Sequence, residues 1–376
     1  GLGLFGLATP GEPLTGEGRG AADSETVTVT VLQPDHNSLL SYGGYGDAGI
    51  LVDTLLAKSE RALRGGGSDL LIWPENAVDA AVTVDSWLSR RIGASAEEWN
   101  TAVLTGMIAV ETYAPGQAPP LHRGDPGRTP YNVYNSAVFY PGRAPGGEGG
   151  AAAGGADPAA PLVYHKANLV PIVERFPFVD VLARLPLLER VDWPGIMGYG
   201  KGERAQVFTL PSGVRTFGLI CYDSVYSDWA RAFVRQGAGF ISVITNDGWW
   251  GNTSGHVQHF EFARLRAIEF RRTVLRSANN GTSGVILPDG SVQVRTPYGV
   301  QDAFTVKIRP REALTFYART GNWVGWGSAG VALGVLLALG APAVLGRGRR
   351  RGGSVRPDVD ADVEADVVGG PLEGSG

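Results

Sequence analysis

Short runs of β-branched and apolar residues recur along the chain, and several of them are separated by segments of helical periodicity. The runs predict strands at residues 27–32, 70–73, 103–110, 136–140, 217–221, 240–245, 274–277 and 285–287. Apolar positions at intervals of three and four predict helices at residues 48–63, 228–236 and 257–272. Strands alternating with helices predict an α/β fold, and the strands that follow one another between residues 274 and 306 predict mixed sheets.

A longer apolar segment lies near the C-terminus. No charged residue occurs from position 320 to 346, and "WVGWGSAGVALGVLLALGAPAVL", which begins at Trp323, has 23 mostly apolar residues. A bilayer requires about 20, so we predict a transmembrane helix at 320–346; a buried hydrophobic helix is the alternative. The basic run "RGRRR" follows at 347–351. The positive-inside rule therefore predicts a cytoplasmic C-terminus, with the preceding domain outside.

The remaining segments complete the predicted domain organisation. The chain begins with Gly1, and the apolar stretch at residues 1–8 is too short to span a bilayer. We therefore expect residues 1–26 to be the remnant of an upstream membrane segment and a linker. Residues 27–319 form the predicted extracytoplasmic globular domain, in which the Gly/Ala/Pro-rich stretch at 141–161 predicts a loop. Residues 347–376 are first basic and then acidic, which predicts a disordered cytoplasmic tail.

Composition narrows the class of protein. The 33 basic and 37 acidic residues give a formal net charge of −4, which argues against nucleic acid as a partner. A single cysteine excludes an intramolecular disulfide framework. Neither a Cys-x-x-Cys pair nor a His-rich cluster indicates a metal site, and we expect no metal or organic cofactor.

Three residues that could perform covalent catalysis come next to predicted strand ends. Glu75 follows "DLLIWP", Lys166 follows "PLVYH", and Cys221 closes "TFGLI". Functional groups gather at the carboxyl ends of strands in α/β sheets, so the three side chains can meet there. A thiolate can attack a carbonyl, a carboxylate can take its proton and a cation can stabilise the oxyanion. Taken singly, a buried structural cysteine and solvated Glu and Lys side chains are the alternatives.

The sequence segments around these three residues resemble those of a known protein family. The segments "LLIWPENAV", "YHKANLVPIVERFPF" and "GLICYDS" occur in this order, followed by "ITNDGWWGNTSGHVQHFEFARLRAIEFRRTVLRSANNGTSGVI". They resemble the carbon-nitrogen hydrolase (nitrilase) superfamily and, within it, are most similar to the apolipoprotein N-acyltransferase family. The resemblance covers about residues 27–307 and extends to the final apolar segment. It implies a four-layer αββα sandwich.

The resemblance also implies a Glu-Lys-Cys triad. By motif, Glu75 in "WPE" is the general base, Lys166 in "YHK" stabilises the oxyanion, and Cys221 in "ICY" is the acyl-accepting nucleophile. The family has a further functional glutamate eight positions after the lysine, which corresponds to Glu174 in "LVPIVE". Val173 replaces the glycine that precedes this glutamate in the family motif.

Four other residues are predicted to support the site or bind substrate. The Tyr-Glu pair that follows the family's cysteine corresponds to Tyr222 and Asp223, so the carboxylate is one methylene shorter. Asn168 stands where family members often have histidine. Trp249 and Trp250 lie among turn residues and are expected to border an acyl tunnel or a membrane interface; ordinary packing is the alternative.

A dense group of apolar residues follows the lysine motif at 175–197. Pro186 prevents one long helix there. The residues concerned are Phe176, Phe178, Leu182, Leu185, Leu187, Leu188, Trp193, Ile196 and Met197. The segment is interpreted as a mobile lid that meets the bilayer, with two short amphipathic elements packed on the core as the alternative.

The function that the resemblance implies is a two-step acyl transfer. Cys221 would take a fatty acyl chain from a phospholipid as a thioester and pass it to the N-terminal α-amine of diacylglyceryl-cysteine in a lipoprotein. The implied partners are a phospholipid donor, a diacylated apolipoprotein acceptor and the bacterial cytoplasmic (inner) membrane, with the catalytic domain on its outer side. A membrane-anchored amidase or nitrilase that hydrolyses a small amide is the alternative enzyme, and an inactive domain that only binds lipoproteins is the alternative from another class.

Overall fold

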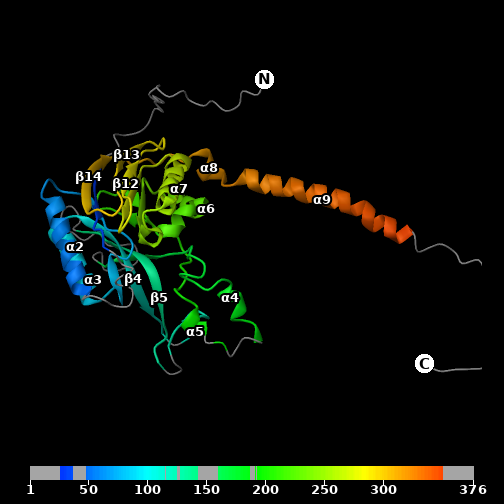
Figure 1. The fold of residues 1–376 in the computed structure, drawn as a ribbon, viewed down its shortest axis with the longest axis horizontal. Coiled ribbons are helices and arrows are strands. Elements are labelled where there is room, and N and C mark those ends of the chain that lie inside the picture. The colour runs from blue at the N-terminus through cyan, green and yellow to red at the C-terminus, as the bar shows by residue number, and fades with distance from the viewer. Residues whose placement is uncertain are drawn as a thin grey trace, which may run out of the picture. The chain divides into compact units, whose positions relative to one another are not determined.

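The computed structural model describes residues 26–36, 48–114, 116–124, 128–142, 160–186, 191 and 193–349. The predictions for residues 1–25, for most of the loop at 141–161, for Leu187 and Leu188, and for the tail beyond 349 lie outside these residues. The chain divides into two compact units, Gly1–Gly321 and Asn322–Gly376, which are described separately. Figure 1 shows the fold.

The larger sheet of the first unit has seven strands in the order β14-β1-β2-β4-β5-β6, with β3 paired to β4. The strands are β1 (Val27–Gln33), β2 (Leu70–Ile72), β3 (Val78–Val82), β4 (Ala102–Thr112), β5 (Tyr131–Tyr140), β6 (Leu162–His165) and β14 (Asp302–Ile308). β1, β2 and β4 run parallel, whereas β14, β5 and β6 pair antiparallel with their neighbours. The sheet is therefore mixed, as predicted.

The second sheet has five strands in the order β13-β12-β11-β10-β9. Its strands are β9 (Gly218–Ile220), β10 (Ile241–Thr245), β11 (Val274–Ala278), β12 (Gly284–Ile286) and β13 (Val292–Arg295). β9, β10 and β11 are parallel, and β12 and β13 return antiparallel. A short hairpin of β7 (Phe208–Thr209) and β8 (Arg215–Thr216) lies outside both sheets.

Side chains that alternate along the strands build four layers. In β2, Leu70 and Ile72 belong to the core shared with the second sheet, whereas Leu71 packs with α2 (Ala48–Leu63) and α3 (Trp87–Glu98). The opposite face of the second sheet is covered by α6 (Ser227–Arg235) and α7 (Ser254–Phe270). The order of layers is helix, sheet, sheet, helix (Figure 1), which agrees with the predicted αββα sandwich.

The predicted helices at 48–63, 228–236 and 257–272 correspond to α2, α6 and α7. Helix α3 was not predicted from the sequence, although Ser86 caps it by accepting a hydrogen bond from the Ser89 N–H (3.3 Å). Leu88, Ile92 and Ala96 also recur every four residues on its buried face. Three strands end one residue earlier than predicted: β2 at Ile72, β12 at Ile286 and β9 at Ile220, after which Cys221 begins the short 3₁₀ helix η2 (Cys221–Val225).

The second unit contains helix α9 (Trp323–Arg349), whose large apolar side chains are exposed as far as Leu339. Among the residues that the structure describes, no helix is long and apolar enough to cross a membrane. The transmembrane helix predicted at 320–346 is therefore not confirmed.

Candidate active site

Glu75 follows β2 through Trp73 and Pro74 and lies between the two sheets at 3% exposure. The backbone of β4 passes close behind it, because a Cβ added to Gly106 would lie 2.5 Å from the Glu75 Cα. Only glycine fits there. Glu75 Oε2 accepts a hydrogen bond from the backbone N–H of Asn246 (2.8 Å), which comes from the second sheet.

Lys166 directly follows β6, and its side chain is 1% exposed. Its Nζ donates to Glu174 Oε1 at 2.8 Å and to Glu75 Oε1 at 3.3 Å. Burial alone would lower the pKa of Lys166, but Glu75, Cys221 and Glu174 together raise it above the ordinary value. The ammonium is therefore a buried cation held between two carboxylates.

Asn135 of β5 links these two carboxylates and was not predicted from the sequence. Its Nδ2 donates to Glu75 Oε1 (2.7 Å) and to Glu174 Oε1 (3.0 Å). The other oxygen of Glu174 accepts from the backbone N–H of Val170 (2.7 Å). Asn135 is 2% exposed in β5. A polar amide inside a run of apolar strand residues is the sequence signal that could have identified it, because buried polar groups need hydrogen-bond partners.

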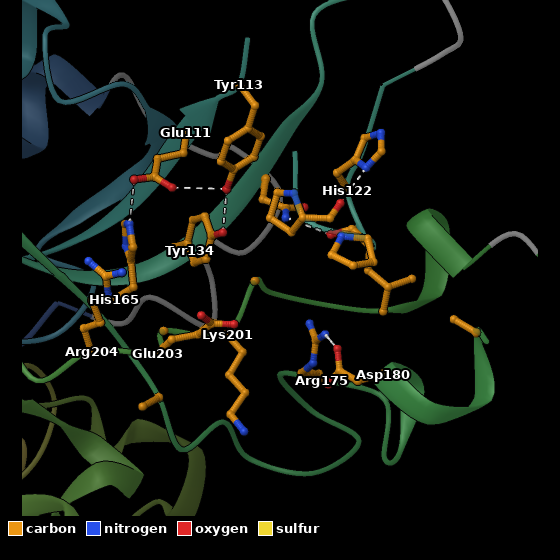
Figure 2. A pocket seen from close by; sticks show the side chains of 18 of the residues that line it. Glu111, Tyr113, His122, Tyr134, His165, Arg175, Asp180, Lys201, Glu203 and Arg204 are labelled. Carbon is orange, nitrogen blue, oxygen red and sulfur yellow. Dashed lines mark hydrogen bonds and ion pairs between the residues drawn. The ribbon is translucent and has the colours of Figure 1, made fainter. Parts of the chain in front are cut away.

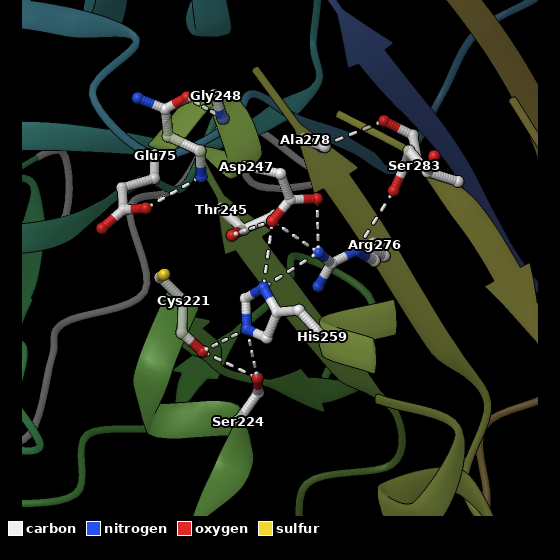
Figure 3. Close-up of polar contacts among 12 residues, drawn as sticks. Glu75, Cys221, Ser224, Thr245, Asp247, Gly248, His259, Arg276, Ala278 and Ser283 are labelled. Atoms are coloured by element: carbon white, nitrogen blue, oxygen red, sulfur yellow. Dashed lines mark hydrogen bonds and ion pairs between the residues drawn. The ribbon is translucent and has the colours of Figure 1, made fainter. Parts of the chain in front are cut away.

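Cys221 lies at the turn between β9 and η2 with φ +46°, a left-handed conformation that is unusual for a residue other than glycine. Figure 3 shows its Sγ pointing toward the Glu75 carboxylate. Burial raises the pKa of the Cys221 thiol well above its ordinary value, Glu75 raises it further, and Lys166 acts in the opposite direction. The thiol is therefore protonated near neutral pH and requires a base.

A second polar cluster holds the backbone of Cys221, and the sequence analysis did not identify it (Figure 3). The Cys221 carbonyl accepts from Ser224 Oγ (2.7 Å) and lies 3.1 Å from His259 Nε2. His259 Nδ1 is 2.9 Å from Asp247 Oδ1, and Arg276 Nη2 donates to both oxygens of Asp247 at 2.9 and 2.7 Å. Burial opposes the charge of Asp247, but Arg276 and His259 hold its pKa far below the ordinary value.

Asp223, predicted as a supporting residue, connects η2 to the loop after Lys166. Its Oδ1 accepts from the backbone N–H (2.7 Å) and Nδ2 (2.9 Å) of Asn168, and its Oδ2 accepts from Tyr164 Oη (2.7 Å). Burial raises the pKa of Asp223 to about 6 despite these donors. Tyr222, the other member of the predicted pair, packs edge-on against Tyr226 with ring centroids 5.3 Å apart.

Trp249 and Trp250 lie in the 3₁₀ helix η3 (Asp247–Trp250) and differ in their surroundings. Trp249 is 48% exposed and Trp250 is 37% exposed. Trp250 packs edge-on against His259 at 5.0 Å between ring centroids. Trp250 therefore packs against the cluster that holds Cys221, and Trp249 presents an aromatic surface to solvent.

The segment interpreted from the sequence as a lid contains the two short elements that the alternative predicted, and its mobility and bilayer contact stay predictions. It forms two short helices, α4 (Val179–Leu182) and α5 (Trp193–Ile196), around a small core of Val179, Trp193 and Met197. Other apolar side chains of this region remain exposed, among them Ile172 (81%), Phe178 (79%) and Val181 (62%). The segment thus packs on itself and leaves an apolar surface uncovered.

An open groove of about 1530 Å³ lies beside β6, between the ends of β4 and β5 and the segment around α4 (Figure 2). On its wall His165 Nε2 pairs with Glu111 Oε1 (3.1 Å), His165 Nδ1 bonds Ser136 Oγ (2.7 Å), and Tyr134 stacks on the ring. These contacts fix the residue that precedes Lys166. Among the described residues, no group of His, Cys, Asp and Glu is arranged to hold a metal ion.

Comparisons with known proteins agree with this arrangement. The Carbon-nitrogen hydrolase family pattern matches residues 28–313. An apolipoprotein N-acyltransferase of Chlorobaculum tepidum is 32% identical over 331 residues, covering 85% of this chain and 57% of the relative. An apolipoprotein N-acyltransferase of Vibrio parahaemolyticus is 27% identical over 292 residues, covering 77% of this chain and 51% of the relative. The chain therefore spans about half the length of the curated relatives that it matches.

Solved structures share the fold at low sequence identity. A carbon-nitrogen hydrolase superfamily protein from Xanthomonas campestris has a TM-score of 0.50 and 18% identity, covering 76% of this chain and 91% of that chain. A mutant amidase of the nitrilase superfamily from Nesterenkonia has a TM-score of 0.50 and 16% identity, covering 80% and 96%. The predicted α/β fold is confirmed by this likeness, which concerns the fold alone.

Proposed function

This chain belongs to the carbon-nitrogen hydrolase family, and on that premise we propose that it is an acyltransferase. It moves a fatty acyl chain from a phospholipid, through a thioester on Cys221, to the N-terminal α-amine of diacylglyceryl-cysteine in a lipoprotein. One observation carries the proposal: the single cysteine points toward a buried cluster in which Lys166 bonds both Glu75 and Glu174. The similarity to apolipoprotein N-acyltransferases supports this choice of acyl donor and acceptor.

In the first half of the reaction Glu75 accepts the thiol proton of Cys221, and the thiolate adds to the ester carbonyl of the phospholipid. Negative charge develops on the carbonyl oxygen, and the Lys166 ammonium stabilises it. When the tetrahedral intermediate collapses, the ester C–O bond breaks and Glu75 returns the proton to the departing lysophospholipid oxygen. Glu174 fixes the Lys166 ammonium through its 2.8 Å hydrogen bond.

In the second half the neutral α-amine of the acceptor adds to the thioester carbonyl. Glu75 takes a proton from the nitrogen as the C–S bond breaks, and the sulfur of Cys221 leaves with that proton. The product amide and the free thiol restore the starting state. Water would hydrolyse the same thioester, so the low exposure of Glu75 (3%), Lys166 (1%) and Cys221 (5%) favours transfer to the amine.

Both substrates are lipids, and the chain offers apolar surface that suits them. Phe178 and Val181 are exposed at α4, and α9 exposes Val331, Leu336 and Leu339. We propose that these surfaces contact the bilayer, with the catalytic unit at the outer face of the bacterial cytoplasmic membrane. Trp249, at 48% exposure, suits the border between the lipid and the site.

The test is intact-mass analysis of the chain after incubation with phospholipid vesicles. We expect a gain of one fatty acyl mass that is absent in Cys221→Ser and is discharged by a diacylated cysteine peptide. Glu98→Gln, which neutralises an exposed carboxylate on α3, serves as a control that acylates normally. Release of ammonia from a small amide without any dependence on lipid would instead favour an amidase.

A further inference from the structure

Behind the nucleophile lies a buried ionic cluster for which the two-step reaction above has no role. His259 of α7 is 3% exposed, and Asp247 of η3 and Arg276 of β11 are fully buried. The three residues come from separate elements and converge on the backbone of Cys221. Placing three ionisable groups in a protein interior is costly, so the cluster requires an explanation beyond packing.

The hydrogen bonds of this cluster fix the orientation of the His259 ring. Arg276 donates to both oxygens of Asp247, and His259 Nδ1 lies 2.9 Å from Asp247 Oδ1 and 3.2 Å from Arg276 Nη2. Ser224 Oγ donates its only hydroxyl proton to the Cys221 carbonyl (2.7 Å). His259 Nε2 lies 3.1 Å from that same carbonyl and 3.2 Å from Ser224 Oγ, so it too must donate. His259 therefore contacts the Cys221 carbonyl through Nε2, while Asp247 and Arg276 fix the ring from the Nδ1 side.

The Cys221 carbonyl that His259 contacts belongs to the same peptide unit as the Tyr222 N–H. In a trans peptide the carbonyl of one residue and the N–H of the next point in opposite directions. Fixing the Cys221 carbonyl on His259 and Ser224 therefore aims the Tyr222 N–H to the other side of the chain. Figure 3 shows the Cys221 carbonyl on the His259 side and its Sγ on the Glu75 side. The Tyr222 N–H is in the first turn of η2, where backbone donors have no intrahelical acceptor.

We infer that His259 is a positioning residue that orients the Tyr222 N–H as an oxyanion donor opposite Lys166. This inference rests on the proposed function. When the Cys221 thiolate adds to an acyl carbonyl, the carbon–oxygen π pair moves to oxygen, which then accepts hydrogen bonds from Lys166 Nζ and Tyr222 N–H. No atom is transferred to or from His259. Its contribution is to hold the peptide unit between Cys221 and Tyr222 in one orientation, next to a residue at φ +46°.

The test compares two reactions of the same thiol in the full chain. Acylation of Cys221 by p-nitrophenyl butyrate forms an oxyanion, whereas alkylation by iodoacetamide forms none. Misplacing a reacting group by about 1 Å costs up to about 100-fold in rate. We therefore expect His259→Gln to slow acylation by about 10- to 100-fold while alkylation stays within about 3-fold of the parent.

Two further variants keep the result unambiguous. His256→Gln makes the same change one turn earlier on α7, where the ring packs on Tyr298 at 4.7 Å, and should leave both rates near those of the parent. Ser224→Ala removes the other donor to the Cys221 carbonyl and should slow acylation selectively, to a smaller extent. Should His259→Gln not fold, as judged by thermal unfolding, the ratio of the two rates in Ser224→Ala decides the question.

Two outcomes would overturn the inference: His259→Gln acylating as fast as the parent, or both reactions falling in parallel. Either leaves the proposed function standing, provided that the parent is acylated. A parent chain whose Cys221 is alkylated but is never acylated, by the ester or by phospholipid, contradicts the proposed function itself.

Discussion

The acidity of the Cys221 thiol depends on the charges beside it. Burial and Glu75 raise its pKa, whereas Lys166 lowers it. In Glu75→Gln the negative charge is removed and Lys166 remains, so the pKa of the thiol falls. We predict that alkylation of Cys221 by iodoacetamide, followed against pH, rises at lower pH in Glu75→Gln than in the parent, while acylation is lost because the base is absent.

The matched control for this prediction is Glu98→Gln, whose pH profile should coincide with that of the parent. A profile for Glu75→Gln that is unchanged or displaced to higher pH would show that the charge of Glu75 does not raise the pKa of the Cys221 thiol. Retention of acylation would show instead that another group takes the proton. The two measurements therefore separate the charge of Glu75 from its role as a base.

Individual site residues differed in how far the sequence could predict them. Glu75, Lys166, Glu174 and Cys221 stand in short contiguous motifs, so a single chain was enough to select them. The partners that hold them come from far along the chain. Asn135 is 60 positions from Glu75, and the backbone of Asn246, which bonds the same carboxylate, is 171 positions away. No local pattern specifies such pairs, because they exist only after the sheets have packed.

Among the elements, periodicity predicted the helices α2, α6 and α7 but not the amphipathic helix α3. The helix expected at 48–63 is α2 with the same bounds, since its apolar residues repeat over four turns. Short elements were missed: β3 is five residues long and pairs only with β4. The strand predicted at 217–221 ended one residue early because Cys221 adopts φ +46°, which ends a strand and which no propensity scale predicts for cysteine.

The connection between η2 and the loop after β6 yields a second prediction. Because the pKa of buried Asp223 is about 6, above its usual value of 3.8, the folded chain binds the proton more tightly than the unfolded chain. Asp223 therefore contributes stability below about pH 4 that is lost as the pH rises through about 6, on the order of 3 kcal/mol in all. Asp223→Asn carries no charge at either pH and should escape this loss.

The measurement is the free energy of unfolding of the parent and of Asp223→Asn, by urea titration at about pH 4 and about pH 7. The stability of the variant relative to the parent should be greater at the higher pH, whatever the lost hydrogen bonds to Asn168 and Tyr164 cost at both. A relative stability that does not change with pH, or changes in the opposite direction, would contradict the assigned pKa. Asp228→Asn, on the neighbouring helix α6, is the control.

At the scale of the whole molecule, the site forms where the two sheets face each other. Glu75 and Lys166 follow strands of the larger sheet, whereas Cys221 and Asn246 follow strands of the smaller one. The hydrogen bond from the Asn246 N–H to Glu75 Oε2 joins the two sheets within the site. The core between the two sheets and the core between the larger sheet and helices α2 and α3 both lie within the unit Gly1–Gly321. The catalytic geometry should therefore not require the second unit.

This division gives the last prediction, which concerns a chain that ends at Gly321. Because both cores remain, its thermal unfolding and the acylation of Cys221 by p-nitrophenyl butyrate should match those of the full chain. Binding to phospholipid vesicles, measured by co-sedimentation, should fall sharply, since α9 exposes Leu333, Leu336 and Leu339 and burying each large apolar side chain yields about 1.5–3 kcal/mol. Vesicle binding that survives the truncation would assign the lipid contact to the apolar surface around Phe178 instead. A loss of ester acylation would mean that residues beyond Gly321 shape the site.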